Sequence, residues 1–427
     1  MQNAERKSLF LLSCLALLVT SLSFGIRAGI LTPLGMEFGL SNEQLAMIAG
    51  TAFWGFPLAI IIGGFLVDIV GIKRLMVIAG FLHILGILLT VLSQGFWTLF
   101  LSTLLIGVAN GTVEAACNPL VATIFPENKT TKLNHFHLWF PGGIVIGSLI
   151  SFFFTRLGWG WQIQVGTMLL PAIIYLFMTF GKSFPVTERV ASGITYNEML
   201  RSLLKPLFIF MVFCMLGTAI TELFTNQWIE VLLNKVTDSG LILLAITAGV
   251  QTVGRAFAGP MVEKFSPTGT LLVSAILSAA GLFILSQVSG GLLFLGAFIF
   301  GMGITYFWPT MLGFVSENIP ESGALGMNLI GGMGMFAVTI YMVFMGGYYD
   351  QLILNQLPEG ADLVTYQISK SGSPEAEAFI EAQTAAGPEI LRVTLIIPLI
   401  LIVAFAGLFI YMRKKSTNSP TFKGNLA

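Results

Sequence analysis

The stretch Asn110-Gly-Thr-Val-Glu114-Ala-Ala-Cys-Asn118-Pro119 places one carboxyl group and two amides inside an otherwise apolar part of the chain. Asn110, Glu114 and Asn118 are four residues apart, so a helix carries them as one polar stripe. An ionisable side chain at membrane depth costs about 2.5–3.5 kcal/mol on insertion scales and usually faces a wet, functional passage. The stripe therefore predicts a site for a polar solute or a proton. The alternative is a structural carboxyl that neighbouring helices satisfy.

A second carboxyl, Glu222, lies in the apolar segment 206–232, and Asn226 and Thr225 lie on or near the same helical face. Arg27 interrupts the first apolar segment of the chain. Both charges fall in the predicted outer halves of their segments. We hypothesise that Arg27 and Glu222 pair and help to close the outer side in one state. The alternative is that each charge is satisfied within its own half of the chain.

Aromatic and amide side chains in the apolar segments are suited to sugar binding, because sugars offer C–H faces to rings and hydroxyls to amides. Each of them, taken alone, also fits ordinary packing or an anchor at the membrane interface. The candidates are Trp54, Trp139, Tyr306, Trp308, Asn328 and Gln251.

The elements that must position these residues are membrane helices. Of 427 residues 55% are hydrophobic and only 10% are charged, whereas a soluble domain has about 25% charged residues. A chain this apolar cannot cover a surface that faces water, so its outside must face lipid. Segments of about 20 mainly apolar residues predict twelve spans, near 8–31, 44–67, 73–93, 97–124, 134–155, 160–181, 206–232, 239–262, 270–288, 291–315, 323–347 and 389–412.

The lysines and arginines predict the orientation. Most of the 21 basic residues fall on the side of the spans that carries the N-terminus. Because cytoplasmic loops carry the excess of basic residues, we expect a multi-pass protein of the cell (inner) membrane with both termini cytoplasmic. The first apolar run continues to Leu31 without a small-residue cleavage site, so we interpret it as a span and not as a signal peptide.

Two polar segments predict the domain organisation. Residues 182–205 separate an N-terminal six-helix bundle, 1–181, from a C-terminal six-helix bundle, 206–427. We expect this segment to be a cytoplasmic linker. Residues 348–388 form an acidic outer loop with an Ala/Glu stretch near 374–385 that is typical of a short surface helix. A solvated loop or a lid that handles the solute both fit its composition.

The two halves also repeat each other at one nearly constant offset. Gly107 recurs as Gly301, Asn134 recurs as Asn328, and the position of Glu114 recurs as Trp308. Trp308 is therefore the preferred aromatic candidate for the site. Two similar bundles with a site between them are the architecture expected for alternating access.

The loop after the second span reads Gly64-Phe-Leu-Val-Asp68-Ile-Val-Gly71-Ile-Lys73-Arg74. It resembles the signature loop between helices 2 and 3 of the major facilitator superfamily. The resemblance implies an inner gate formed by Asp68, Lys73 and Arg74, with Arg255 in the weaker copy of the second half. Ile69 stands where the family usually has an arginine. The alternative is that these are ordinary flanking charges at span ends.

The fourth segment, together with Lys132-Leu133-Asn134, resembles the fucose/galactose/glucose–proton symporter branch of that superfamily. In this branch a glutamate precedes an Asn-Pro pair in helix 4, and a Leu-Asn pair opens helix 5. The resemblance implies that Glu114 takes part in proton coupling and sugar binding. The family's helix-1 aspartate has no match here, because the corresponding region reads Phe24-Gly-Ile-Arg27.

We therefore predict an all-α integral membrane protein with twelve helices in two pseudo-symmetric bundles, acting as a secondary active transporter of a small polar solute, a sugar, with proton symport. Glu114 is expected to be protonated from outside, to support solute binding in its neutral form, and to release the proton after inward opening. One alternative is an organic-anion transporter in which Arg27 binds a carboxylate or phosphate. Another is a membrane sensor that binds a solute without transporting it.

Other function classes are not expected. No arrangement of a nucleophile with a base, and no metal-ligand cluster, points to an enzyme. His135 and His137 are two residues apart, which is a poor spacing for a metal pair on a helix, and the three cysteines lie in apolar runs. We expect no cofactor and no metal. Lysine plus arginine and aspartate plus glutamate both total 21, so the charge gives no sign of nucleic-acid binding. The expected partners are the solute, a proton and the lipid bilayer, and we expect a monomer.

Overall fold

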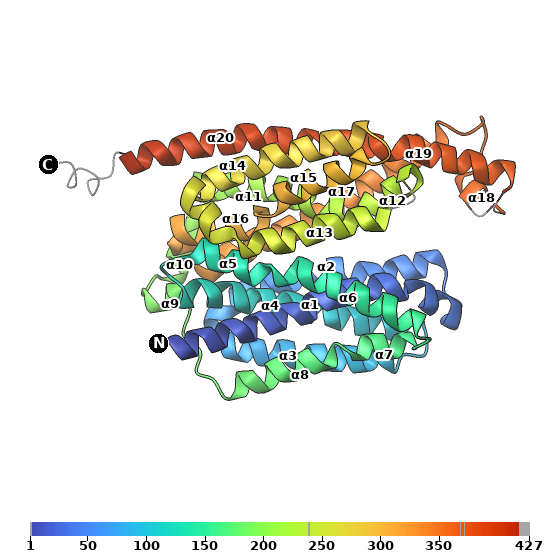
Figure 1. Cartoon of the computed structure of the whole chain (residues 1–427). Helices are drawn as coiled ribbons and strands as arrows, with labels where there is room; N and C mark the ends of the chain where they lie inside the picture. Colours follow the sequence, from blue (N-terminus) through green and yellow to red (C-terminus); the bar gives the residue numbers. More distant parts are fainter. Residues whose placement is uncertain (1, 238–239, 368, 371, 418–427) are drawn as a thin grey trace. The chain divides into compact units, whose positions relative to one another are not determined.

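The computed structural model describes residues 2–237, 240–367, 369–370 and 372–417, and these residues form helices joined by short turns, without a β-strand (Figure 1). Within them, eleven helices are long and apolar enough to cross a membrane, and Ile242–Ala256 is a shorter apolar helix. All twelve predicted spans fall on these helices. The prediction of an all-helical membrane protein is confirmed.

The first six spans comprise eight helices, because the fifth and sixth spans are each divided in two. The helices are α1 (Asn3–Phe38), α2 (Asn42–Val70), α3 (Ile72–Val91), α4 (Phe96–Ile124), α5 (Lys129–His137), α6 (Trp139–Arg156), α7 (Trp161–Gly166) and α8 (Leu169–Phe180). Two short helices follow in the predicted linker, α9 (Glu188–Ala191) and α10 (Tyr196–Ser202).

The second half begins with a seventh span that contains a π-helical turn. It consists of α11 (Pro206–Ala219), the π-turn η1 (Ile220–Phe224) and α12 (Thr225–Thr237). The remaining helices are α13 (Gly240–Ala256), α14 (Ala258–Gln287), α15 (Leu292–Ile304), α16 (Phe307–Asn318), the 3-10 turn η2 (Pro320–Ser322), α17 (Gly323–Leu354), α18 (Leu363–Gln367), α19 (Pro374–Thr394) and α20 (Ile396–Thr417).

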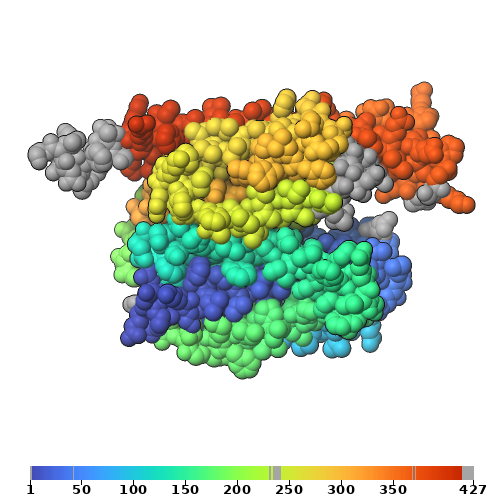
Figure 2. Space-filling view, in the orientation of Figure 1, coloured from blue at the N-terminus to red at the C-terminus, as the bar shows by residue number. Residues whose placement is uncertain are grey.

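Two predicted boundaries differ from the structure. The break expected between residues 262 and 270 is reduced to a kink inside α14 at Ser266, whose φ is 60°. The next residue is Pro267, which lacks the N–H that a continuous helix needs. The surface helix expected near 374–385 extends to Thr394. In Figure 1, α18 and α19 project beyond α12, against which α19 packs, and in Figure 2 their side chains form the orange surface at the right of the view.

The structure separates into two compact units that do not coincide with the two halves of the sequence. The first unit contains residues 1–215, 255–259 and 308–336, and the second contains residues 216–254, 260–307 and 337–427. The first unit therefore includes α16 from Trp308 onward and the beginning of α17. The domain boundary at the linker, residues 182–205, stays a prediction.

Glycines allow the helices inside each unit to approach closely. In the first unit α2 packs along α4, and a Cβ on Gly107 would lie 2.8 Å from the carbonyl oxygen of Thr51. In the second unit a Cβ on Gly301 would lie 3.1 Å from the Cα of Thr247 on α13. Small residues are typical of such contacts in membranes. The repeated glycines thus have the same packing role in each half.

The signature loop also needs a glycine for its shape. Gly71 joins α2 to α3 with a φ of 89°, a left-handed conformation that residues with a Cβ rarely adopt. The sharp turn brings the end of α2, which carries Asp68, next to the start of α3, which carries Lys73 and Arg74.

Candidate functional site

Glu114 is the centre of a buried polar cluster in the first unit. It lies on α4 and is 2% exposed. Asn118, one turn further along the same helix, donates from Nδ2 to Glu114 Oε2 at 2.6 Å. His137, at the end of α5, donates from Nε2 to Asn118 Oδ1 at 3.0 Å and lies 3.8 Å from Glu114 Oε2. The carboxyl group is therefore held by an amide that is itself held by an imidazole.

Arg255 joins this cluster from the residues 255–259 that belong to the same unit. Its Nη1 donates to the carbonyl oxygen of His137 at 2.9 Å, and the side chain is fully buried. Its positive charge acts electrostatically on both Glu114 and His137. A buried carboxyl close to a buried guanidinium can exist in either protonation state, because an apolar interior favours the neutral acid, whereas the amide donor of Asn118 and the cation support the carboxylate.

Asn110 belongs to a different network, although it shares the α4 stripe. Its Oδ1 accepts from His83 Nε2 at 2.8 Å, and its Nδ2 donates to Ser23 Oγ at 3.1 Å. The other ring nitrogen of His83 accepts from the hydroxyl of Tyr175 at 2.8 Å. The side chains of these residues thus satisfy one another's hydrogen-bonding groups in the buried space between the helices α1, α3, α4 and α8. The structure brings Glu114 and Asn118 together and places Asn110 elsewhere.

Asn134 and Asn328, which the sequence repeat pairs, make matching contacts within the first unit. Asn134 on α5 donates to Thr310 Oγ1 on α16 at 3.2 Å, and Asn328 on α17 donates to the carbonyl oxygen of Ala115 on α4 at 3.0 Å. The Oδ1 atom of each amide is buried and has no hydrogen-bond partner in the described part of the chain. Buried acceptors are normally satisfied, so these two atoms are available for donors on a ligand.

Of the aromatic candidates, Trp308 lies in the first unit and is buried. One edge of its ring would lie 3.5 Å from a Cβ on Gly331 of α17. Trp139 is half-buried at the start of α6, whereas Trp54 is 54% exposed. Tyr306 belongs to the second unit, where its hydroxyl donates to the carbonyl oxygen of Gly254 at 2.8 Å.

The predicted gate residues have separate roles. Asp68, whose side chain is 1% exposed, pairs with Arg189 of α9 at 2.5 Å and also accepts from the hydroxyl of Thr187. Lys73 donates to the carbonyl oxygen of Phe180, the last residue of α8, at 3.2 Å and to that of Lys182, just after the helix, at 2.8 Å.

The linker thus supplies the cation that the signature loop lacks. Arg74 is exposed, and its donor lies 3.5 Å from the carbonyl oxygen of Val70. Ile69, at the position where the family has an arginine, is 71% exposed. Arg189 therefore provides the positive charge beside Asp68 that the family's arginine, here replaced by Ile69, would otherwise provide.

A second ion pair joins the linker to the start of α5. Lys129 Nζ donates to both oxygens of Glu188 at 2.8 and 2.7 Å, and lies 3.4 Å from the carbonyl oxygen of Ser316 on α16. Next to it, the backbone and hydroxyl of Thr130 donate to Glu317 Oε1 at 3.0 and 2.7 Å. At the end of the first unit that carries the N-terminus, α5, α9 and α16 are therefore connected by charged and polar contacts.

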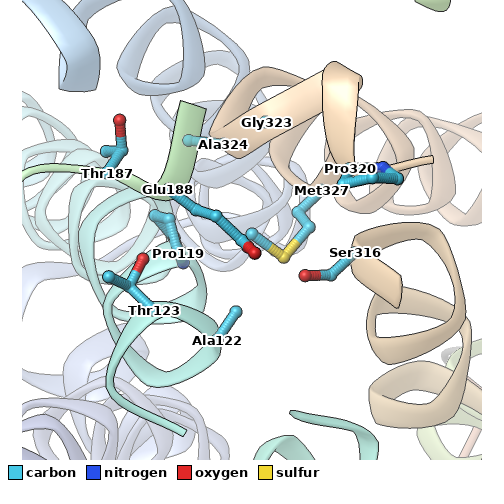
Figure 3. A pocket seen from close by; sticks show the side chains of 10 residues that line it. All are labelled: Pro119, Ala122, Thr123, Thr187, Glu188, Ser316, Pro320, Gly323, Ala324 and Met327. Carbon is cyan, nitrogen blue, oxygen red and sulfur yellow. The ribbon is translucent and has the colours of Figure 1, made fainter. Parts of the chain in front are cut away.

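A small pocket lies beneath α9 (Figure 3). Its volume of about 10 Å³ is enough for one water molecule. Figure 3 shows the side chain of Glu188 reaching over it toward Met327 and Ser316, with Pro119 and Thr123 of α4 on the other side. Pro119 directly follows Asn118, so the pocket lies next to the Glu114 cluster along α4.

Arg27 is buried in the first unit beside the ring of Phe24, and its Nη1 donates to the carbonyl oxygen of Ala49 at 3.3 Å. It lines a mainly apolar cavity of about 20 Å³ among α1, α2, α3, α4 and the sixth span. Glu222 is buried in the second unit and accepts from Gln251 Nε2 at 2.5 Å. Since the two charges belong to different units, their pairing stays a prediction.

Several residues of these clusters were not predicted as functional. His137 was considered only as a metal ligand, and Lys129 and Arg189 only among the basic residues that predict the orientation. The feature of the sequence that could have indicated a functional role for His137 is its place on the segment that opens with Leu133-Asn134. In the described residues no group of three or more His, Cys, Asp or Glu side chains is placed to hold a metal ion.

Comparison with known proteins gives three kinds of match. Residues 13–342 match the model of the Major Facilitator Superfamily. Among curated proteins, the D-xylose transporter of Levilactobacillus brevis is 22% identical over 78% of this chain and 70% of its own length. The facilitated glucose transporter member 10 of mouse is 26% identical over 41% of this chain. This match covers 34% of the mouse protein, so the chain spans about a third of that relative.

Among solved structures, the Escherichia coli fucose:proton symporter matches 92% of this chain and 98% of its own with a TM-score of 0.67 at 15% identity. The proton:xylose symporter XylE matches 94% of this chain and 97% of its own with a TM-score of 0.69 at 13% identity. These likenesses confirm the predicted fold of twelve membrane helices in two pseudo-symmetric bundles.

Proposed function

Because the chain belongs to the Major Facilitator Superfamily, we propose that it is a secondary active transporter that moves a sugar by alternating access with proton symport. The named relatives support this choice, since they include a D-xylose transporter, a galactose–proton symporter and a fucose:proton symporter. The fold supports alternating access, in which two bundles move around a central site.

The observation that carries the proposal is the Glu114 cluster. A buried carboxyl on a membrane helix that is bonded to Asn118 and lies near Arg255 is suited to bind and release a proton. We propose that the protonated Glu114 supports solute binding. After the proton leaves, Asn118 and Arg255 stabilise the carboxylate until the next cycle.

The solute is proposed to bind beside this carboxyl. The buried Oδ1 atoms of Asn134 and Asn328 can accept hydrogen bonds from sugar hydroxyls. The ring of Trp308 can cover a C–H face of the sugar. Neither group needs a charged ligand, which is the reason for preferring a neutral sugar to an organic anion.

The linker helix α9 is proposed to hold the cytoplasmic side closed. Two ion pairs join α9 to the ends of two spans, one between Asp68 and Arg189 and the other between Lys129 and Glu188. Inward opening must separate these pairs so that the pocket beneath α9 becomes accessible. This proposal includes the orientation derived from the basic residues, with both termini in the cytoplasm, and a monomer in the cell (inner) membrane.

The Arg27 cavity bears on the alternative of organic-anion transport. A volume of about 20 Å³ admits one or two water-sized species, and it is too small for an organic acid. In this conformation the cavity beside Arg27 therefore does not hold an organic acid. A sensor that binds a sugar without moving it would use the same residues and differs only in flux.

Counterflow in proteoliposomes separates these functions. Vesicles that contain the purified protein and are loaded with unlabelled sugar should accumulate the labelled form of that sugar transiently. Matched sugar acids should give no accumulation. Counterflow of acids but not of neutral sugars would favour the organic-anion transporter. Binding that raises the Tm without any counterflow would favour the sensor.

A further inference from the structure

The first unit contains a buried positive charge that the proposed transport cycle does not use. Arg27 lies on α1 and is 8% exposed. Its guanidinium carries several N–H donors, of which one has an acceptor among the described residues, since Nη1 donates to the carbonyl oxygen of Ala49 at 3.3 Å. The ring of Phe24 lies 5.8 Å from Cζ. Neither the carbonyl group nor the ring carries a negative charge that would balance the guanidinium.

Arg27 differs in this respect from the other buried lysine and arginine in the described part of the first unit. Lys129 donates to both oxygens of Glu188, and Arg255 acts electrostatically on Glu114. No carboxylate within the described residues of this unit forms an ion pair with Arg27. A buried charge without a counter-charge is costly, because the interior does not replace the solvation that water provides. An anion from outside the chain is therefore expected beside Arg27.

The cavity beside Arg27 has room for a small anion. Its volume of about 20 Å³ is somewhat more than the roughly 10–15 Å³ that one water molecule needs. A halide ion is only slightly larger than a water molecule and fits this space, whereas an organic acid does not. All the residues that line the cavity belong to the first unit, and most of them are isoleucine, leucine, valine or methionine.

The hydroxyl groups in the cavity wall do not provide a counter-charge. Ser23, Thr90 and Thr103 each donate to a backbone carbonyl oxygen of their own helix, at 2.6, 2.8 and 2.7 Å. Hydroxyls in helices are commonly satisfied in this way. The remaining wall is mainly apolar, so it offers few partners to a neutral water molecule. The guanidinium is therefore the group that selects the occupant of the cavity, and it selects by charge.

We propose that Arg27 and this cavity bind a chloride ion or another halide of similar size. One guanidinium balances one negative charge, which favours a monovalent ion over sulfate or phosphate. The inference goes beyond the proposed function, because neither the sugar nor the proton on Glu114 takes part. The predicted pair of Arg27 with Glu222 belongs to another state of the cycle, in which the carboxylate replaces the ion as the counter-charge.

Thermal unfolding of the purified full-length protein tests the site without any sugar. The Tm is measured in sodium chloride, sodium bromide and sodium methanesulfonate, mixed in varying proportions at constant ionic strength. We expect chloride to raise the Tm by about 2 °C over methanesulfonate, with a dependence on chloride concentration that saturates as the site fills. Bromide should act as chloride does. Methanesulfonate is the reference, because its anion is too large for the cavity.

Substitutions locate the effect. Arg27→Met removes the charge and keeps most of the length of the side chain, so it should abolish the chloride response. Because it also removes a buried charge, its Tm in methanesulfonate should not fall below that of the unsubstituted protein. Loss of a merely structural arginine would lower the Tm in every salt.

Two further variants complete the test. Arg156→Met is the matched control and should keep the response, because Arg156 is an exposed arginine of the same unit that also lies beside a ring, that of Phe152 at 4.5 Å. If Arg27→Met fails to fold, Val165→Ile provides a second measurement. Val165 lines the cavity, so the added methylene narrows the space while the charge stays, and the chloride response should weaken.

Three results would overturn the site. The Tm would be the same in chloride and in methanesulfonate, or Arg27→Met would keep the chloride response, or the response would appear only after Glu222→Gln. The last result would mean that Glu222, and not an ion, balances Arg27 in the unsubstituted protein. None of these results affects sugar counterflow, so failure of the chloride site and failure of the proposed function are distinguishable.

Discussion

Replacing Arg189 with alanine tests whether the linker helix α9 holds one side of the protein closed. The Asp68 side chain is 1% exposed and that of Arg189 is 11% exposed, with 2.5 Å between the charged atoms. Removing one partner of a buried ion pair costs about 3–5 kcal/mol, because the other charge stays buried and unpaired. Thr187 still donates to Asp68, so we expect a value near 3 kcal/mol. This shifts the equilibrium toward undocked α9 by a factor of about 100.

Cysteine labelling measures this shift. Thr123 lines the pocket beneath α9, and its hydroxyl has no hydrogen-bond partner among the described residues, so Thr123→Cys removes no hydrogen bond. The three native cysteines are buried. In Arg189→Ala we expect a small maleimide to modify Cys at position 123 up to about 100-fold faster. Arg201→Ala is the matched control, because Arg201 is an exposed arginine of α10 in the same linker, and it should leave the rate unchanged.

A double-mutant cycle decides whether the ion pair is the cause. In Asp68→Asn the buried charge is absent, so adding Arg189→Ala should change the labelling rate little further. If the effects of the two substitutions are instead additive to within about 0.5 kcal/mol, the pair does not hold α9, and the reasoning is refuted.

Three further predictions concern stability. Asn110→Ala should lower the free energy of unfolding by about 1–3 kcal/mol, because it removes the hydrogen-bond partner of Nε2 in the buried His83. It should leave the apparent sugar affinity unchanged, and a specific loss of affinity in counterflow would contradict this. Glu127→Gln should lower the Tm by about 1 °C or less at neutral pH. The Glu127 backbone N–H and the Arg6 side chain lower the pKa of this carboxyl from its ordinary 4.5, so the stabilisation is present above 4.5 and should be lost as the pH falls through the lowered value. If the Tm difference between Glu127→Gln and the unsubstituted protein instead grew toward acid pH, this prediction would be contradicted. Gly111→Ala should lower the free energy of unfolding by about 1–3 kcal/mol, because the added Cβ meets the carbonyl oxygen of Phe56. Gly50→Ala is the control and should not destabilise the protein, because no atom lies within 4 Å of its added Cβ. Equal Tm values for the two variants would count against the packing argument.

The fold could be predicted from the sequence because its main determinant is local. An apolar run of sufficient length specifies a membrane helix by itself, and the twelve runs all fall on helices. The loop glycine Gly71 was identified as part of a motif, and its φ of 89° explains why a glycine stands there. The kink at Ser266 was not predicted as such, since a helix on both sides of Pro267 requires packing that sequence spacing does not contain.

The site could be predicted only in part, because spacing gives the face of a helix but not its neighbours. The stripe of Asn110, Glu114 and Asn118 lies on one helix, as the spacing predicts, and the structure buries all three side chains. The spacing gave no indication that Asn110 bonds to His83 while Asn118 bonds to Glu114. Arg189 lies 121 residues from Asp68, and only the folded chain brings the two together.

The central claim is that Glu114 carries the coupled proton, and replacing it with glutamine tests this most directly. In proteoliposomes with an imposed pH gradient, Glu114→Gln should lose uphill sugar accumulation and keep counterflow exchange, because glutamine mimics the protonated acid. Glu127→Gln, which alters an exposed carboxyl, should keep both activities. If Glu114→Gln still accumulates sugar against its gradient when driven by the pH difference, the account of proton coupling is contradicted.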